Sequence, residues 1–90
     1  MERFIIAVFA DSKTAMAAQQ ALTQAKIYAP VMPTPRELTD HCGLSLRFPP
    51  ASLAQVKGTL EGCGLREEEG NVGFYRMEYD AHSRIVAPIA

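Results

Sequence analysis

Hydrophobic patterning along this 90-residue chain predicts one α+β domain, with four antiparallel strands in a sheet and two helices on one of its faces. A continuous apolar run near the N-terminus is typical of a central strand. Two stretches with apolar residues at three- and four-residue steps predict amphipathic helices. An alternating segment in the middle of the chain and an aromatic segment near its end predict further strands.

The first strand is expected from Arg3 to Phe9, with both faces at least partly covered. Asp11 and Ser12 are good N-cap residues for a helix that ends near Lys26. The apolar face of this helix is expected to hold Ala15, Met16, Ala18, Leu22 and Ala25. This spacing is that of core positions, so it indicates packing against the sheet.

A second strand is expected from Tyr28 to Met32, short or at an edge because of Pro30. Pro33-Thr34-Pro35 then predicts a turn, since each proline fixes its own φ and restricts the residue before it. Glu37 to His41 is long enough for a single helical turn. The third strand is expected from Gly43 to Phe48, where apolar and polar residues alternate.

A second helix is expected from about Ala51 to Gly62. Its apolar face holds Leu53, Val56 and Leu60. Cys63 extends this stripe, so we interpret it as a small buried residue at the helix end. The fourth strand extends from Val72 to Tyr79 and completes a domain over residues 1–79. The tail, residues 80–90, is compatible with an extra edge strand, a segment docked on the sheet or a contact for a partner subunit.

Two βαβ units with right-handed crossovers give the order βαββαβ, which is the ferredoxin-like arrangement. Such a sheet leaves one face uncovered. Small domains often cover an open face by dimerising, so a homodimer through this face is a natural partner interaction.

Composition excludes several classes of protein. Nine basic and ten acidic residues give a net charge of −1, which argues against nucleic acid as the main partner. No apolar run approaches the roughly 20 residues of a membrane span, so no membrane partner is expected. Two cysteines are too few for a disulfide scaffold and suit a reducing compartment. We therefore expect a cytoplasmic protein.

Reactive side chains concentrate between residues 33 and 48. Cys42 lies between a polar loop and a strand, with His41 beside it, and positive neighbours would favour its nucleophilic thiolate. Gly43 removes side-chain bulk next to the sulfur. The pattern leaves a reactive Cys42 and an inert loop cysteine equally open. Arg36 follows the proline turn and is suited to bind an anion, although most loop arginines are simply solvated.

A metal site would have to use His41, Cys42, Cys63 and His82. Their spacing contains no Cys-x-x-Cys or His-x-x-x-His pair, which makes a zinc site a poor interpretation. The chain also lacks a Walker or Rossmann glycine loop and a Gly-x-Ser-x-Gly elbow. The sequence therefore predicts neither a metal nor an organic cofactor.

The runs Pro33-Thr34-Pro35-Arg36, Cys42-Gly43-Leu44 and Leu46-Arg47-Phe48 resemble the putative selenium/sulfur carrier protein-like family, over roughly residues 3–79. The resemblance implies that Cys42 accepts sulfur or selenium as a persulfide or selenosulfide and passes it to a partner protein. A cysteine desulfurase would be one such partner. Arg36 would stabilise the terminal anion or bind an acidic group of the partner. We place Thr34 and Gly43 in the same anion-binding site. Any activity would be at most sulfurtransferase-like.

Two other classes of function are compatible with the pattern. In a small-molecule-binding regulatory module, the loop from Pro33 to Gly43 would hold an anion through Arg36, and Cys42 would be a bystander. In a structural oligomerisation domain, the open sheet face and the tail would form the contacts.

Overall fold

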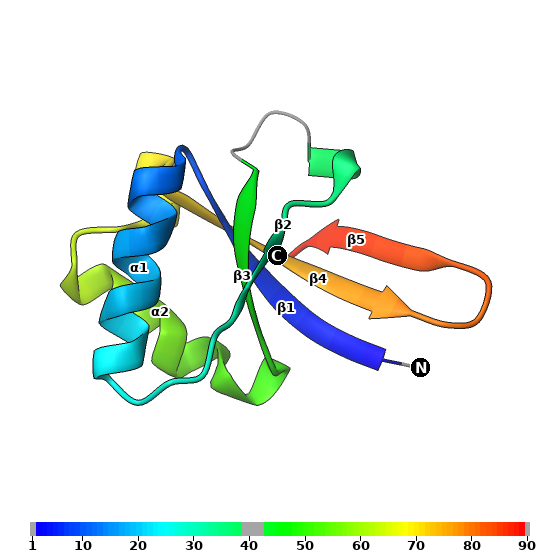
Figure 1. Ribbon diagram of the computed structural model, residues 1–90, viewed down its shortest axis with the longest axis horizontal. Coiled ribbons are helices and arrows are strands. Elements are labelled where there is room, and N and C mark those ends of the chain that lie inside the picture. Colours follow the sequence, from blue (N-terminus) through cyan, green and yellow to red (C-terminus); the bar gives the residue numbers. More distant parts are fainter. Residues whose placement is uncertain (1, 39–42, 90) are drawn as a thin grey trace.

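The computed structural model describes residues 2–38 and 43–89 of the chain. Its elements are β1 (Glu2–Phe9), α1 (Ser12–Gln24), β2 (Val31–Pro33), β3 (Leu44–Phe48), α2 (Leu53–Gly62), β4 (Val72–Tyr79) and β5 (Arg84–Pro88) (Figure 1). Short 3-10 turns are η1 (Arg36–Leu38), η2 (Pro50–Ser52) and η3 (Glu67–Glu69). The α+β class is confirmed. Within the described ranges, no helix has the length and apolarity needed to cross a membrane.

The sheet has five strands in the order β2-β3-β1-β4-β5, and every neighbouring pair is antiparallel. The predicted four-stranded sheet is therefore wrong in strand number. The fifth strand forms because the chain reverses at Asp80, whose Oδ1 accepts hydrogen bonds from the backbone N–H groups of His82 and Ser83, both at 2.8 Å. β5 then runs back along β4 and forms the sheet edge.

β1 is the central strand, as its apolar run predicts. It pairs with β3 on one side and with β4 on the other, and residues 5–9 are all buried. Side chains alternate between the two faces of a strand. Ile5 and Phe9 accordingly lie in the cluster under the helices, whereas Ile6 and Val8 lie in a second cluster on the opposite face.

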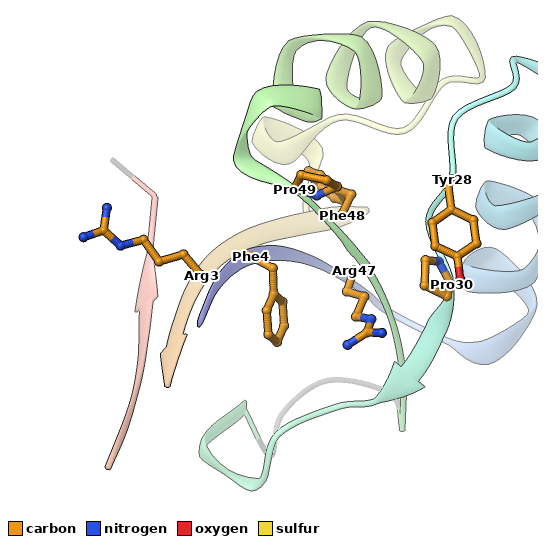
Figure 2. Close-up of a pocket in the computed structure, with 7 residues that line it drawn as sticks. All are labelled: Arg3, Phe4, Tyr28, Pro30, Arg47, Phe48 and Pro49. Atoms are coloured by element: carbon orange, nitrogen blue, oxygen red, sulfur yellow. The ribbon is translucent and has the colours of Figure 1, made fainter. Parts of the chain in front are cut away.

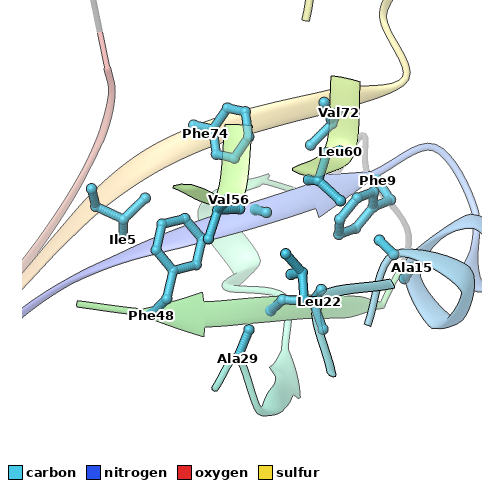
Figure 3. Close-up of a cluster of buried hydrophobic side chains, with 13 residues drawn as sticks. Ile5, Phe9, Ala15, Leu22, Ala29, Phe48, Val56, Leu60, Val72 and Phe74 are labelled. Carbon is cyan, nitrogen blue, oxygen red and sulfur yellow. The ribbon is translucent and has the colours of Figure 1, made fainter. Parts of the chain in front are cut away.

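Both helices pack on one face of the sheet, where α1, α2, β1, β3 and β4 share one apolar cluster (Figure 3). The Asp11 side chain begins α1 by accepting the Thr14 N–H at 2.7 Å. The buried residues of the two helices are Ala15, Ala18, Leu22, Val56 and Leu60. Two predicted core residues of α1 are exposed instead. Met16 projects beside the buried stripe with half of its surface exposed, and Ala25 is the C-cap beyond the last turn.

β2 is shorter than predicted and begins at Val31. Pro30 has no N–H to donate to a ladder, and its carbonyl accepts the Arg47 N–H at 3.0 Å just before the regular pairing starts. Tyr28 lies outside the strand and is 79% exposed. β3 starts at Leu44, one residue later than expected, and β4 has the predicted limits.

The sheet face opposite the helices is expected to be open, but its centre is covered by side chains of the same chain. Ile6, Val8 and Met77 on this face are each fully buried within the single chain. The side chains packed around them are Phe4, Met32, Leu38, Tyr75, Tyr79 and Val86. Leu38 comes from η1 and Val86 from β5, so the two segments that the sequence left least defined contribute to this second cluster.

Leu22→Ala should lower the free energy of unfolding by about 2–5 kcal/mol, because it removes buried methyl groups and leaves a cavity between α1 and the sheet. Met16→Ala on the same helix is the matched control, with an expected change within about 0.5 kcal/mol because Met16 is half exposed. Urea denaturation measures both. Equal losses for the two variants would contradict this orientation of α1.

Candidate functional site

The loop between β2 and β3 is closed at its base by Thr34. The Thr34 N–H donates to the Gly43 carbonyl at 3.0 Å, directly beyond the last ladder pair of Pro33 with Leu44. The Thr34 hydroxyl lies 2.7 Å from the hydroxyl of Ser45, which is fully buried. The chain therefore enters and leaves this loop at fixed, adjacent points.

The predicted nucleophile Cys42 and its neighbour His41 lie outside the described residues. Of the other predicted site residues, Thr34 and Gly43 are brought together by their hydrogen bond. Arg36 lies on η1, exposed, and forms no ion pair with any residue of the described ranges. A methyl group at Gly43 would meet no atom of the described residues within 4 Å, so these residues leave space beside it.

η1 is held in place from both sides of Arg36. The Leu38 N–H donates to the Pro35 carbonyl at 2.9 Å, which forms the turn. Glu37 accepts two hydrogen bonds from Arg84 of β5, from Nε at 2.9 Å and from Nη2 at 2.5 Å. Such a bidentate pair fixes orientation as well as distance. Hydrogen bonding from Arg84 lowers the pKa of Glu37, and the same contact raises the pKa of Arg84.

The start of β3 lies at the same end of the sheet as the start of α1 (Figure 1). The pairing of Val8 with Ser45 sets this arrangement, because β1 ends where the antiparallel β3 begins. A helix N-terminus favours a nearby thiolate through its partial positive charge. The cap residue Asp11 opposes this effect, since the Thr14 N–H lowers the pKa of its carboxyl and keeps it ionised.

Cys63 is exposed, so the interpretation of it as a buried residue is wrong. It is the C-cap of α2, and Gly64 reverses the chain with a φ of +84°, so the helical stripe does not continue through Cys63. Its thiol lines a cavity of about 330 Å³ together with Lys13, Leu65 and the first turn of α1. The sequence does contain a signal for this exposure. Gly62 and Gly64 mark the end of the helix, so Cys63 lies where the buried stripe stops.

Across residues 2–38 and 43–89, no group of three or more His, Cys, Asp or Glu side chains is placed to hold a metal ion. Two of the four ligands considered from the sequence, His41 and Cys42, lie outside these ranges. His82 is exposed in the turn before β5, and Cys63 is at the end of α2.

Residues 4–69 match the profile of the family described as Putative Se/S carrier protein-like. The chain belongs to this family. The matched segment includes Thr34, Arg36, Cys42 and Gly43, and it ends before β4 and β5. Arg84, the partner of Glu37, is therefore outside it. No curated protein and no solved structure matches the chain.

Thr34→Val should cost about 1–3 kcal/mol of unfolding free energy, because the fully buried Ser45 hydroxyl would lose its partner. Adding Ser45→Ala should recover part of that loss, since the unpaired hydroxyl is then removed as well. Urea denaturation of the two single variants and the double variant gives the coupling energy. Strictly additive losses would show that the two hydroxyls do not interact.

Acidification should weaken the contact between Glu37 and Arg84. The pKa of Glu37 is lowered from 4.5 in the folded protein, so the pair stabilises the fold above the unfolded pKa and loses this effect as the pH falls through the folded pKa. The difference in unfolding free energy between wild type and Glu37→Gln should therefore shrink on acidification. Urea denaturation across this range measures it.

The matched control for this pH series is Glu61→Gln, on the exposed side of α2 with no ion pair to the described residues. Its effect on the free energy of unfolding should stay within about 0.5 kcal/mol, because it is an exposed position and no ion pair is removed. A Glu37→Gln difference that stayed constant with pH would contradict an electrostatic role for the Glu37–Arg84 pair.

Proposed function

We propose that this protein carries sulfur or selenium on Cys42 between partner proteins. The observation that carries the proposal is the family match. The matched residues, 4–69, include the whole loop between β2 and β3, which Thr34 closes at its base. Cys42 is the one cysteine of that loop, and the second cysteine of the chain, Cys63, follows α2.

The reaction is a thiol–persulfide exchange that needs no outside oxidant. The Cys42 thiolate attacks the terminal sulfur of a donor persulfide, forms a new S–S bond, and the donor leaves as its thiolate. The product is Cys42 persulfide. Attack by an acceptor thiolate on its outer sulfur regenerates the Cys42 thiolate. The selenium version follows the same exchange, with a selenium atom at the outer position. A cysteine desulfurase is a suitable donor, and this donor class favours a cytoplasmic location.

Three structural features support Cys42 as the carrying residue. Cys42 directly precedes Gly43 in the sequence, and Gly43 is anchored by Thr34. The space that the described residues leave beside Gly43 supports approach by a partner protein. The start of α1 lies at the same sheet end, where its partial positive charge favours a thiolate, an effect that the charge of Asp11 partly offsets.

We propose that Arg36 binds the terminal sulfur anion that forms in this exchange. Its guanidinium is exposed and without an ion pair among the described residues, while η1 beneath it is fixed by Pro35 and by the contact of Glu37 with Arg84. A pre-positioned guanidinium binds a terminal sulfur anion or a partner carboxylate at a low entropic cost. Thr34 and Gly43 complete the site by holding the loop base.

We also propose that β2-β3-β1-β4 with the two helices is a ferredoxin-like core to which β5 is added. The strand order and the antiparallel pairing of these four strands support this description. In this arrangement, the carrier loop is the connection between the second and third strands, β2 at the sheet edge and β3 beside it.

Wild-type protein incubated with a cysteine desulfurase and cysteine should gain the mass of one or more sulfur atoms, and Cys42→Ser should not. Intact-protein mass spectrometry measures the adduct. Cys63→Ser is the necessary control because Cys63 is also exposed, and it should gain sulfur as wild type does. Arg36→Gln should keep the adduct but form it more slowly, as the terminal anion loses its cation.

An adduct present on Cys42→Ser and absent from Cys63→Ser would move the carrier role to Cys63. An absence of adduct from all variants would contradict the carrier function and favour the regulatory, anion-binding alternative. In that alternative, an anionic metabolite would raise the melting temperature of Cys42→Ser as much as that of wild type, and Arg36→Gln would abolish the shift.

A further inference from the structure

A second hollow lies at the far end of β3, away from the carrier loop. Its volume is about 230 Å³. It is lined by Arg3, Phe4, Tyr28, Pro30, Arg47, Phe48 and Pro49 (Figure 2). β3 runs from Leu44, beside Gly43, to Phe48, and at about 3.3 Å per residue the two ends are more than 10 Å apart. The hollow is therefore separate from the proposed carrier site.

The walls of this hollow are apolar and rigid. Phe4 presents its ring from β1, Phe48 lines the hollow although its side chain is buried in the cluster under the helices, and the prolines at 30 and 49 have a fixed φ. The hydrogen bond from the Arg47 N–H to the Pro30 carbonyl joins the segment before β2 to β3. Tyr28 forms the outer wall and is 79% exposed, the largest exposed fraction among the large apolar side chains of the described residues. A ligand bound here would cover the Tyr28 ring, which is otherwise exposed to solvent.

Two arginines, Arg3 and Arg47, line this hollow, and Arg47 is the one that lies over an aromatic ring. The guanidinium carbon of Arg47 lies 5.8 Å from the centre of the Phe4 ring, and Arg47 forms no ion pair with the described residues. By contrast, Arg66, Arg76 and Arg84 each pair with a glutamate. Figure 2 shows the Arg3 side chain directed away from Phe4, so Arg47 is the cation beside that ring. No lining residue is acidic.

We propose that this hollow binds a small aromatic carboxylate. The ring would lie against Phe4, Tyr28 and the prolines, and the carboxylate would accept hydrogen bonds from Arg47. A guanidinium that stacks on an aromatic ring keeps its in-plane donors available for such an anion. The volume of about 230 Å³ is below the roughly 300–1,000 Å³ of sites for drug-sized ligands, which limits the ligand to about one ring with a short acidic arm.

The test is a two-dimensional amide NMR titration of the full chain with 3-phenylpropionate at neutral pH. Saturable shifts are expected at the backbone amides of Phe4, Tyr28, Arg47 and Phe48. Acetate, which lacks the ring, and 3-phenylpropanol, which lacks the charge, should each bind at least tenfold more weakly. Equal binding of the alcohol and the acid, or shifts that do not saturate, would overturn the proposal.

Variants locate the site and exclude unfolding as the cause. Arg47→Met should weaken binding of 3-phenylpropionate at least tenfold, and Arg47→Lys should weaken it less, because the charge remains and the planar fork is lost. Arg66→Met removes the same charge from an exposed arginine that does not line the hollow, and should change the affinity less than twofold. Tyr28→Ala should weaken binding severalfold without lowering the melting temperature, since Tyr28 is 79% exposed.

Unchanged binding by Arg47→Met, or an equal loss in Arg66→Met, would show that Arg47 does not form the site. Cys42→Ser should bind 3-phenylpropionate as wild type does. The test of the aromatic carboxylate site is therefore independent of the carrier function. The sulfur-adduct experiment can fail while the NMR titration succeeds, and the reverse also holds.

Discussion

Burial of β1 on both faces is the constraint on which the rest of the structure depends. Five consecutive residues, 5–9, are buried, so this strand needs a neighbour on each edge and an apolar layer on each face. Each large apolar side chain fully removed from water contributes roughly 1.5–3 kcal/mol. A 90-residue chain has few other sources of stability on this scale. The helices provide one layer, and the second layer has to come from elsewhere.

That second layer links the candidate carrier loop to the end of the chain. Leu38 of η1 and Val86 of β5 both pack around Ile6, Val8 and Met77. The contact of Glu37 with Arg84 then joins the same two segments at the surface. β5 lies beyond the segment that matches the family, yet it is the strand that fixes η1, the turn that presents Arg36. Stability of the second face and orientation of the loop therefore share one set of contacts.

β3 separates the two sites proposed above, which differ in chemistry. At its first residue, the hydrogen bond of Thr34 with Gly43 closes the loop proposed to carry sulfur. At its last residue, the hollow beside Arg47 has largely apolar walls, and Arg47 lies over the Phe4 ring. The buried ladder of β3 with β1 holds both ends in fixed positions. One site is suited to exchange with a partner thiol, and the other to a small ligand.

The sequence by itself determined the central strand, both helices, the limits of β4 and the family, because these depend on local hydrophobic period and on a short motif. It did not determine the fifth strand, since Arg84–Pro88 is held by pairing with β4 and not by its own pattern. The exposure of Met16 also depended on where α1 meets the sheet. Contacts between residues far apart in the chain, such as Glu37 with Arg84 and Arg47 with Phe4, have no local signal. Only tertiary packing brings them together.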